Sequence, residues 1–171
     1  ENFRRAVARG RLASTFLFVG PEGVGKRTFA VKLAQALLCS AESAQSLDPC
    51  GTCESCVQVT AGTHPDLHIV KKPKDRSFIP LELFIGDKQH RMQQGLCREI
   101  GLKPYMGGRK IAVIDDADLL TWLHDSVSPK AFAVRPPEYS VVTCLPPKRR
   151  CWRMVTANPS RYPIRSLLVR F

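Results

Sequence analysis

A short stretch of the sequence carries glycines and a lysine at a spacing suited to phosphate chemistry. Gly20, Gly23, Gly25 and Lys26 lie within seven residues. Glycines so placed let the backbone curl until its N–H groups face phosphate oxygens, and the lysine reaches the terminal phosphates. A serine or threonine whose hydroxyl ligates Mg²⁺ normally comes next, but here Arg27 follows. The stretch predicts a phosphate-binding loop with an arginine at the magnesium position; the alternative is a turn that binds nothing.

Two adjacent carboxylates follow an apolar run at residues 110–114. Asp115 fits the acidic position that helps hold Mg²⁺ beside a phosphate-binding loop. ATP-hydrolysing ring proteins usually place a glutamate next, to polarise water, and Asp116 is one methylene shorter. Together with Arg27, this predicts weak or absent binding of ATP and Mg²⁺ and no ATPase activity of the chain's own. The alternative for the two aspartates is an acidic capping turn.

Four cysteines are spaced for a single metal ion. Cys39, Cys50, Cys53 and Cys56 provide two C-x2-C steps and a more distant fourth sulfur. Four thiolates without an open position make a structural zinc site. An iron–sulfur cluster and free thiols are the alternatives, but neither ferredoxin spacing is present. Cys97, on the apolar side of an expected helix, is predicted to lie in the core.

Strands and helices must alternate to position these residues. We expect strands at 15–19, 67–70 and 110–114, and helices at 3–12, 25–38 and 86–100. Such alternation predicts an α/β domain with a mainly parallel sheet. Ligands bind at the carboxyl ends of strands in these sheets, and both Gly20 and Asp115 fall there.

Length and composition restrict the class of protein. The 171 residues suffice for one domain, and no apolar run approaches the length of a membrane span. A chain with seven cysteines and no export signal is predicted to be cytoplasmic, with its cysteines as thiols or metal ligands. Because the first residue is Glu1 rather than methionine, we expect a fragment or a processed chain.

The motifs in combination resemble the bacterial clamp-loader ATPase family. The resemblance covers about residues 1–121 and is carried by "LLCSAESAQSLDPCGTCESCVQVTAGTHPDLHIV" (37–70) and "GGRKIAVIDDADLLT" (107–121). It implies an AAA+ type P-loop NTPase core with a zinc module inserted at about residues 39–66. It also implies a subunit of the DNA polymerase III clamp loader in DNA replication. The implied partners are gamma/tau and delta subunits, the sliding clamp indirectly, and primed DNA through the complex.

Within that family the chain resembles the subunit type that does not hydrolyse ATP. Its nucleotide site would then be vestigial, because Arg27 and Asp116 both differ from the ATP-hydrolysing gamma/tau type. An active gamma/tau-like subunit remains one alternative. A zinc-bearing nucleic-acid-binding module is another, since four cysteines alone would allow it.

Residues 122–171 do not match this pattern. They hold 9 Lys/Arg, 2 Asp/Glu and 7 of the 13 prolines, whereas residues 1–121 hold 17 Lys/Arg and 13 Asp/Glu. Out-of-frame translation, a divergent segment and a basic nucleic-acid arm are the competing interpretations. We favour the first, because charge, proline content and pattern change at one point. We therefore expect a sheet that is incomplete at the C-terminus, and we transfer no trans-acting arginine from the family to this chain.

Overall fold

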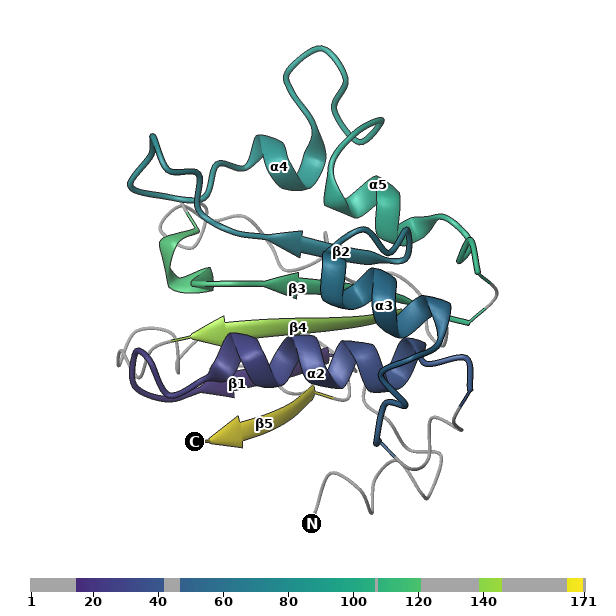
Figure 1. Ribbon diagram of the computed structural model, residues 1–171. Coiled ribbons are helices and arrows are strands. Elements are labelled where there is room, and N and C mark those ends of the chain that lie inside the picture. The colour runs from purple at the N-terminus through teal and green to yellow at the C-terminus, as the bar shows by residue number, and fades with distance from the viewer. Residues whose placement is uncertain (1–14, 42–46, 107, 121–138, 146–165, 171) are drawn as a thin grey trace.

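A sheet of five parallel strands forms the centre of the molecule in the computed structural model, which describes residues 15–41, 47–106, 108–120, 139–145 and 166–170. The strands are β1 (Thr15–Val19), β2 (Leu67–Val70), β3 (Lys110–Ile114), β4 (Tyr139–Leu145) and β5 (Ser166–Arg170). Their order across the sheet is β2-β3-β4-β1-β5 (Figure 1). Since all four pairings are parallel, every strand ends at the same edge.

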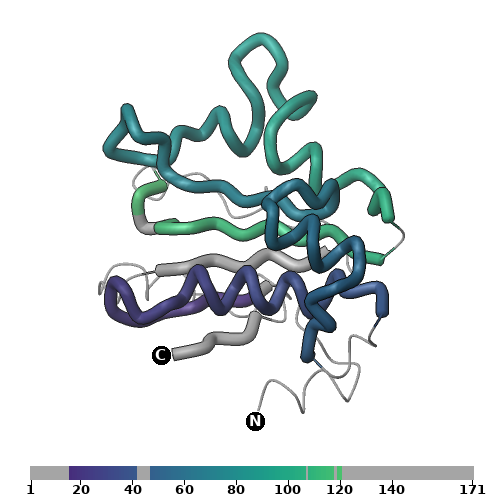
Figure 2. The backbone as a smooth tube through the Cα atoms, viewed as in Figure 1, coloured from purple at the N-terminus to yellow at the C-terminus, as the bar shows by residue number. Residues whose placement is uncertain are grey.

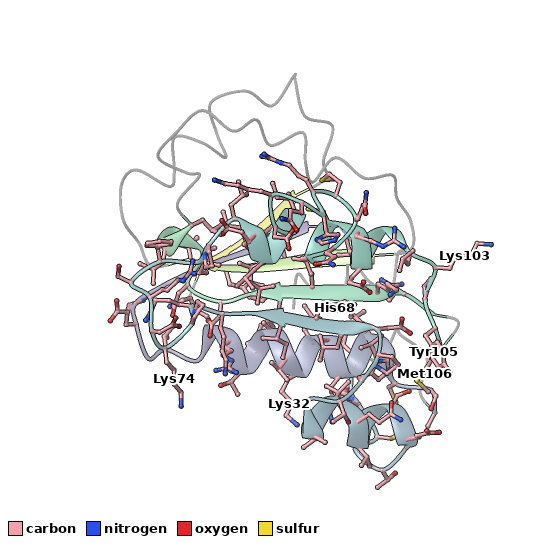
Figure 3. All side chains as sticks on the ribbon, turned by 90° about the horizontal axis from the view of Figure 1, so that it is seen from above. Lys32, His68, Lys74, Lys103, Tyr105 and Met106 are labelled. Atoms are coloured by element: carbon pink, nitrogen blue, oxygen red, sulfur yellow. The ribbon has the colours of Figure 1, made fainter. Side chains whose placement is uncertain are left out.

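Helices cover both faces of this sheet. They are α2 (Lys26–Leu38), α3 (Glu54–Ala61), α4 (Glu82–Ile85), α5 (Leu96–Gly101) and the 3₁₀ turn η1 (Ala117–Leu119). Seen from above, α2 lies on one side of the sheet, with the labelled Lys32 pointing away from it, and α5 lies on the other (Figure 3). The arrangement confirms the predicted α/β class with a parallel sheet.

Alternation along the strands divides the core into two layers. Phe16 and Phe18 pack with α2 and α3, whereas Leu17 and Val19 pack on the side of α4 and α5. The strand β3 alternates in the same way, and all five of its residues are buried. Continuous apolar runs are what a parallel strand covered on both faces requires. The predicted core position of Cys97 is confirmed, since it is buried in the second layer.

The predicted helix over 86–100 is wrong. α4 ends at Ile85, before this range, and α5 begins only at Leu96; a loop that extends away from the sheet joins them (Figure 2). The Asp87 carboxylate accepts the backbone N–H groups of Gln89 (3.0 Å) and His90 (2.7 Å), so it competes with helical hydrogen bonding. Gly95 has φ +85°, and a Cβ there would lie 2.7 Å from the Phe84 carbonyl oxygen. Helical periodicity in the sequence reveals neither the Asp87 hydrogen bonds nor the left-handed conformation of Gly95.

The sheet also differs from the expectation of missing strands. Two of its five described strands, β4 and β5, come from the segment 122–171, and both flank β1. YSVVTCL is mostly apolar and holds three β-branched residues, and SLLVR has an apolar centre of Leu, Leu and Val. Runs this short, set in a basic and proline-rich segment, give only a weak strand signal. The remaining tail and the predicted helix over 3–12 lie outside the described residues.

Candidate functional site

The glycine-rich loop joins β1 to α2 as predicted, at the carboxyl edge of the sheet. Gly23 (φ +77°) and Gly25 (φ +91°) both take the left-handed conformation, which other residues adopt only with strain. In the described part of the chain no side chain caps α2, and its first turn carries no acidic residue. The N–H groups and the positive end of a 13-residue helix are therefore presented where an anion could bind.

The side chain of Lys26 bonds to the backbone of this loop. Its side chain is buried, and Nζ donates to the carbonyl oxygens of Gly20 (3.0 Å) and Pro21 (2.7 Å). An ammonium group offers three protons in all. The bonds hold the lysine over the curled backbone, in the position from which it would meet an anion bound by the loop.

Arg27 contacts the first of the two predicted acidic residues. Its Nε lies 3.5 Å from Oδ2 of Asp115. One strand, β4, separates β1 from β3, so the two residues approach across two strand spacings, about 10 Å. Burial raises the pKa of Asp115 above its ordinary value and neighbouring Asp116 raises it further, while Arg27 and Lys26 oppose the rise.

Asp116 has a different environment. It is exposed and has φ +50°, and its carbonyl oxygen accepts the N–H of Leu119 to begin η1. Its backbone thus turns the chain out of β3. The structure brings Arg27 and Asp115 into contact but gives Asp116 this turn-forming position.

The residues of the loop do not fit Mg²⁺ in the usual way. Arginine cannot ligate a cation, and the guanidinium of Arg27 stands at the carboxylate that would approach the metal. Thr28 carries the nearest hydroxyl, but one residue along a helix rotates a side chain by about 100°. The site therefore holds positive charge of its own beside Asp115.

The four predicted cysteines form one cluster. Their Sγ atoms all lie within 4.8 Å of one another, and the group could hold a metal ion. Cys39 lies 3.6 Å from Cys50 and 3.8 Å from Cys53, and Cys50 lies 4.0 Å from Cys56. Four sulfurs around a tetrahedral zinc at about 2.3 Å would stand about 3.8 Å apart. The donor set and its spacing both fit such an ion.

Backbone N–H groups donate hydrogen bonds to two sulfurs of the cluster. The N–H of Cys53 donates to Sγ of Cys50 (3.3 Å), and the N–H of Cys56 donates to Sγ of Cys53 (3.4 Å). Hydrogen bonds, first from the Ser40 side chain, lower the pKa of Cys53 to about 5, whereas burial raises that of Cys56 to about 12. Cys53 also caps α3, a helix that the sequence analysis did not expect within this module.

A buried carboxylate missed by the sequence analysis joins the cysteine module to the sheet. Asp66 is 1% exposed, and its two oxygens accept the N–H groups of Tyr105 (2.7 Å) and Met106 (2.9 Å). The ammonium of buried Lys110 lies 3.8 Å from the same carboxylate. The sequence offered no signal for Asp66, because burial of a single acid leaves no periodic pattern.

His64 supports Asp66 from the preceding turn. Its Nδ1 accepts the N–H of Asp66 (3.0 Å), so the neutral ring carries its proton on Nε2. Burial lowers the pKa of His64. Among the described residues, the cluster that could hold a metal ion consists of the four cysteines.

These features together define an α/β protein with a parallel sheet, a glycine-rich strand-to-helix loop and a four-cysteine cluster. The family model for "DNA polymerase III, delta subunit" matches residues 1–123. The chain belongs to this family. In the described part of the chain, no helix combines the length and apolar character that a bilayer crossing requires.

Individual relatives agree with this assignment. The DNA polymerase III subunit delta' of Bacillus subtilis is 31% identical over 68% of this chain and 31% of that protein. The gamma/tau subunit of Mycobacterium tuberculosis is 32% identical over 50% of this chain and 18% of its own length. The chain thus spans less than a third of the length of these relatives.

A solved structure supports the fold. The DNA polymerase III, gamma subunit-related protein of Thermotoga maritima superposes with a TM-score of 0.52 at 14% identity. The match covers 99% of this chain and 45% of that one. At this level of identity, the similarity concerns the fold alone.

Proposed function

We propose that the chain is the delta-prime-like subunit of a DNA polymerase III clamp loader, with an AAA+ core that does not hydrolyse ATP. The contact between Arg27 and Asp115 carries this proposal, since it sets a guanidinium where a hydrolysing site needs Mg²⁺. In this role the chain works in the bacterial cytoplasm during DNA replication. It assists ATP-driven loading of the sliding clamp by gamma/tau and delta subunits onto primed DNA.

ATP turnover by the purified 171-residue chain tests the proposal. We expect that the wild type hydrolyses ATP with Mg²⁺ no faster than Lys26→Ala does. The variant also serves as the control for contaminating ATPases. Turnover lost on Lys26→Ala would establish the alternative, an active gamma/tau-like subunit, which similarity to gamma/tau proteins also favours. Co-purification with gamma/tau and delta subunits from the same source tests the partners separately.

We further propose that the four-cysteine cluster holds a structural Zn²⁺. Three sulfur–sulfur distances of 3.6 to 4.0 Å, and a cluster made of cysteines alone among the described residues, favour a closed thiolate site. Elemental analysis should find about one zinc per chain, well below one in Cys50→Ser, and an unchanged content in the control Cys97→Ser. Iron in place of zinc would contradict this assignment.

Four cysteines would also suit a zinc-bearing nucleic-acid-binding module with no loader partners. Such a module would bind DNA by itself, with an affinity that falls steeply with salt. Salt-sensitive binding by the isolated chain, together with no association with loader subunits, would favour this second class of function.

A further inference from the structure

A buried glutamine of α2 is hydrogen-bonded to the beginning of α3. Gln35 is 3% exposed, and its Nε2 donates to the carbonyl oxygen of Cys56 and to Oγ1 of Thr60, each at 3.0 Å. Its Oε1 accepts the ammonium of Lys32 at 3.0 Å. Because an ammonium group only donates, this contact fixes which end of the amide faces α3. Both donors of one side chain on α2 are thus used to hold the neighbouring helix.

The two helices that Gln35 connects also supply three of the four cysteines. Cys39 directly follows α2, about one helical turn after Gln35. Cys53 is the N-cap of α3, and Cys56 lies in the first turn of that helix. Figure 1 shows α3 beside the C-terminal half of α2. The 3.8 Å distance between the sulfurs of Cys39 and Cys53 therefore depends on how the two helices are placed relative to each other.

Apolar packing alone holds this placement only loosely. Leu33 of α2 and Val59 of α3 belong to one buried cluster, but hydrophobic contact has no preferred direction and tolerates small shifts. Hydrogen bonds allow a narrower range of distance and angle. Those of Gln35 act on the backbone of Cys56, and Thr60 Oγ1 donates to the same carbonyl oxygen at 2.9 Å. They therefore restrict the movement of one cysteine of the cluster directly.

We propose that Gln35 is a positioning residue for the metal site of the cysteine cluster. It holds Cys56 where its sulfur can share one ion with the other three. The inference rests on the proposed structural Zn²⁺ and deepens it, because it names a residue outside the cluster that sets the metal affinity. Gln35 acts through the Cys56 backbone rather than on the ion. Since the helices are already placed when the ion arrives, less ordering opposes binding.

Zinc affinity of the full chain, measured by competition with a chromophoric chelator, tests the proposal. Gln35→Met keeps the approximate length of the side chain and removes its hydrogen bonds. We expect it to bind zinc about 10- to 100-fold more weakly, as loss of a partner around a metal ligand typically does. Gln58→Met is the matched control, because Gln58 lies on α3 but donates to Glu54 on the exposed side of the same helix. The control should bind zinc as the wild type does.

Two measurements distinguish a positioning residue from one that only stabilises the fold. In urea unfolding, a merely structural glutamine would lower the free energy of unfolding equally with and without zinc, whereas Gln35→Met should lose more with zinc. Co²⁺ bound in place of zinc reports the arrangement of the four sulfurs through its visible absorption. That spectrum should change in Gln35→Met and stay unchanged in Gln58→Met.

Thr60→Val is a milder change that keeps the test decisive if Gln35→Met folds poorly. Thr60 is exposed, and valine keeps its branched shape while removing the hydroxyl. We expect a smaller loss of zinc affinity than in Gln35→Met. The loss in the double variant should be less than the sum of the two, because both side chains act on the Cys56 carbonyl.

The outcomes separate this inference from the zinc assignment. Wild-type zinc affinity in Gln35→Met, or in Thr60→Val where Gln35→Met does not fold, would overturn the positioning role and leave the assignment intact. Equal losses of stability with and without zinc would do the same. A wild-type chain that binds no zinc would contradict the assignment and the inference together.

Discussion

Arg27 and Asp115 meet at 3.5 Å although one follows β1 and the other follows β3, with β4 between those strands. The contact joins a substitution in the glycine-rich loop to the acid that would serve a metal. Each residue by itself is a local feature of the sequence. Their contact places the arginine of the loop directly at that carboxylate.

The first prediction concerns the pH dependence of stability at Asp115. Burial raises its pKa, so the folded state binds the proton more readily than the unfolded state, and ionisation opposes folding. Asp115→Asn should therefore raise the free energy of unfolding at pH 7 by under about 1 kcal/mol. The gain should shrink as the pH falls through the raised pKa towards the ordinary value of 3.8. Urea unfolding between pH 4 and 7 measures it.

Asp87→Asn is the matched control with the opposite sign. Hydrogen bonds from the His90 backbone lower the pKa of Asp87, so its ionised form stabilises the folded state. This variant should lose stability at pH 7, and the loss should fade as the pH falls below 3.8. If both variants changed the free energy of unfolding in the same direction, the assigned environments of Asp115 and Asp87 would be contradicted.

The second prediction concerns the buried carboxylate of Asp66. Asp66→Ala should lower the free energy of unfolding by about 3–5 kcal/mol, because it leaves two N–H groups and Lys110 without their partner. Asp66→Asn should cost less, since an amide oxygen still accepts one hydrogen bond. Asp75→Ala, at an exposed position, should change stability by under about 0.5 kcal/mol. Equal losses for Asp66→Ala and Asp75→Ala in urea unfolding would contradict the buried position.

The third prediction concerns His64. Its pKa is lowered in the folded state, so the unfolded state binds a proton more readily, and stability should fall as the pH drops below the ordinary value of 6.5. In His64→Asn an amide oxygen can replace Nδ1 as acceptor for the Asp66 N–H without titrating. The stability difference between variant and wild type should therefore shift in favour of the variant from pH 8 to pH 5. A difference that is constant with pH would exclude a buried neutral imidazole.

The fourth prediction concerns the turn between α4 and α5. Gly95→Ala should destabilise the protein by more than about 1 kcal/mol, because φ is +85° and the new Cβ would lie 2.7 Å from the Phe84 carbonyl oxygen. At Gly101 nothing lies within 4 Å of such a Cβ and φ is not positive. Gly101→Ala should be neutral or stabilise by about 0.4–1 kcal/mol. Thermal melting of the two variants would refute this account of the turn if Gly95→Ala proved the milder change.

Local pattern was sufficient for much of the fold and for the members of the candidate site. Strands β1, β2 and β3 and the helix α2 lie where short apolar runs and helical spacing predicted them, because those signals come from neighbours in the chain. Local spacing also predicted the cysteine cluster, since two C-x2-C steps confine three of its sulfurs to a small volume. In contrast, apolar spacing over 86–100 predicted a helix that does not form over this range. Asp87 and Gly95 prevent it through local contacts that do not appear in the apolar periodicity.

The amino-acid sequence by itself determined which chemical groups are present: a glycine-rich loop, an arginine where a hydroxyl is usual, and four thiols spaced so that they could hold one ion. The tertiary structure alone decided which of these groups meet. Strand order brought Arg27 to Asp115 and placed β4 and β5 beside β1, and packing buried Asp66 beneath the loop before β3. The physical reason is that such contacts join residues far apart in the chain. They depend on how whole strands and layers pack, which no short window of sequence encodes.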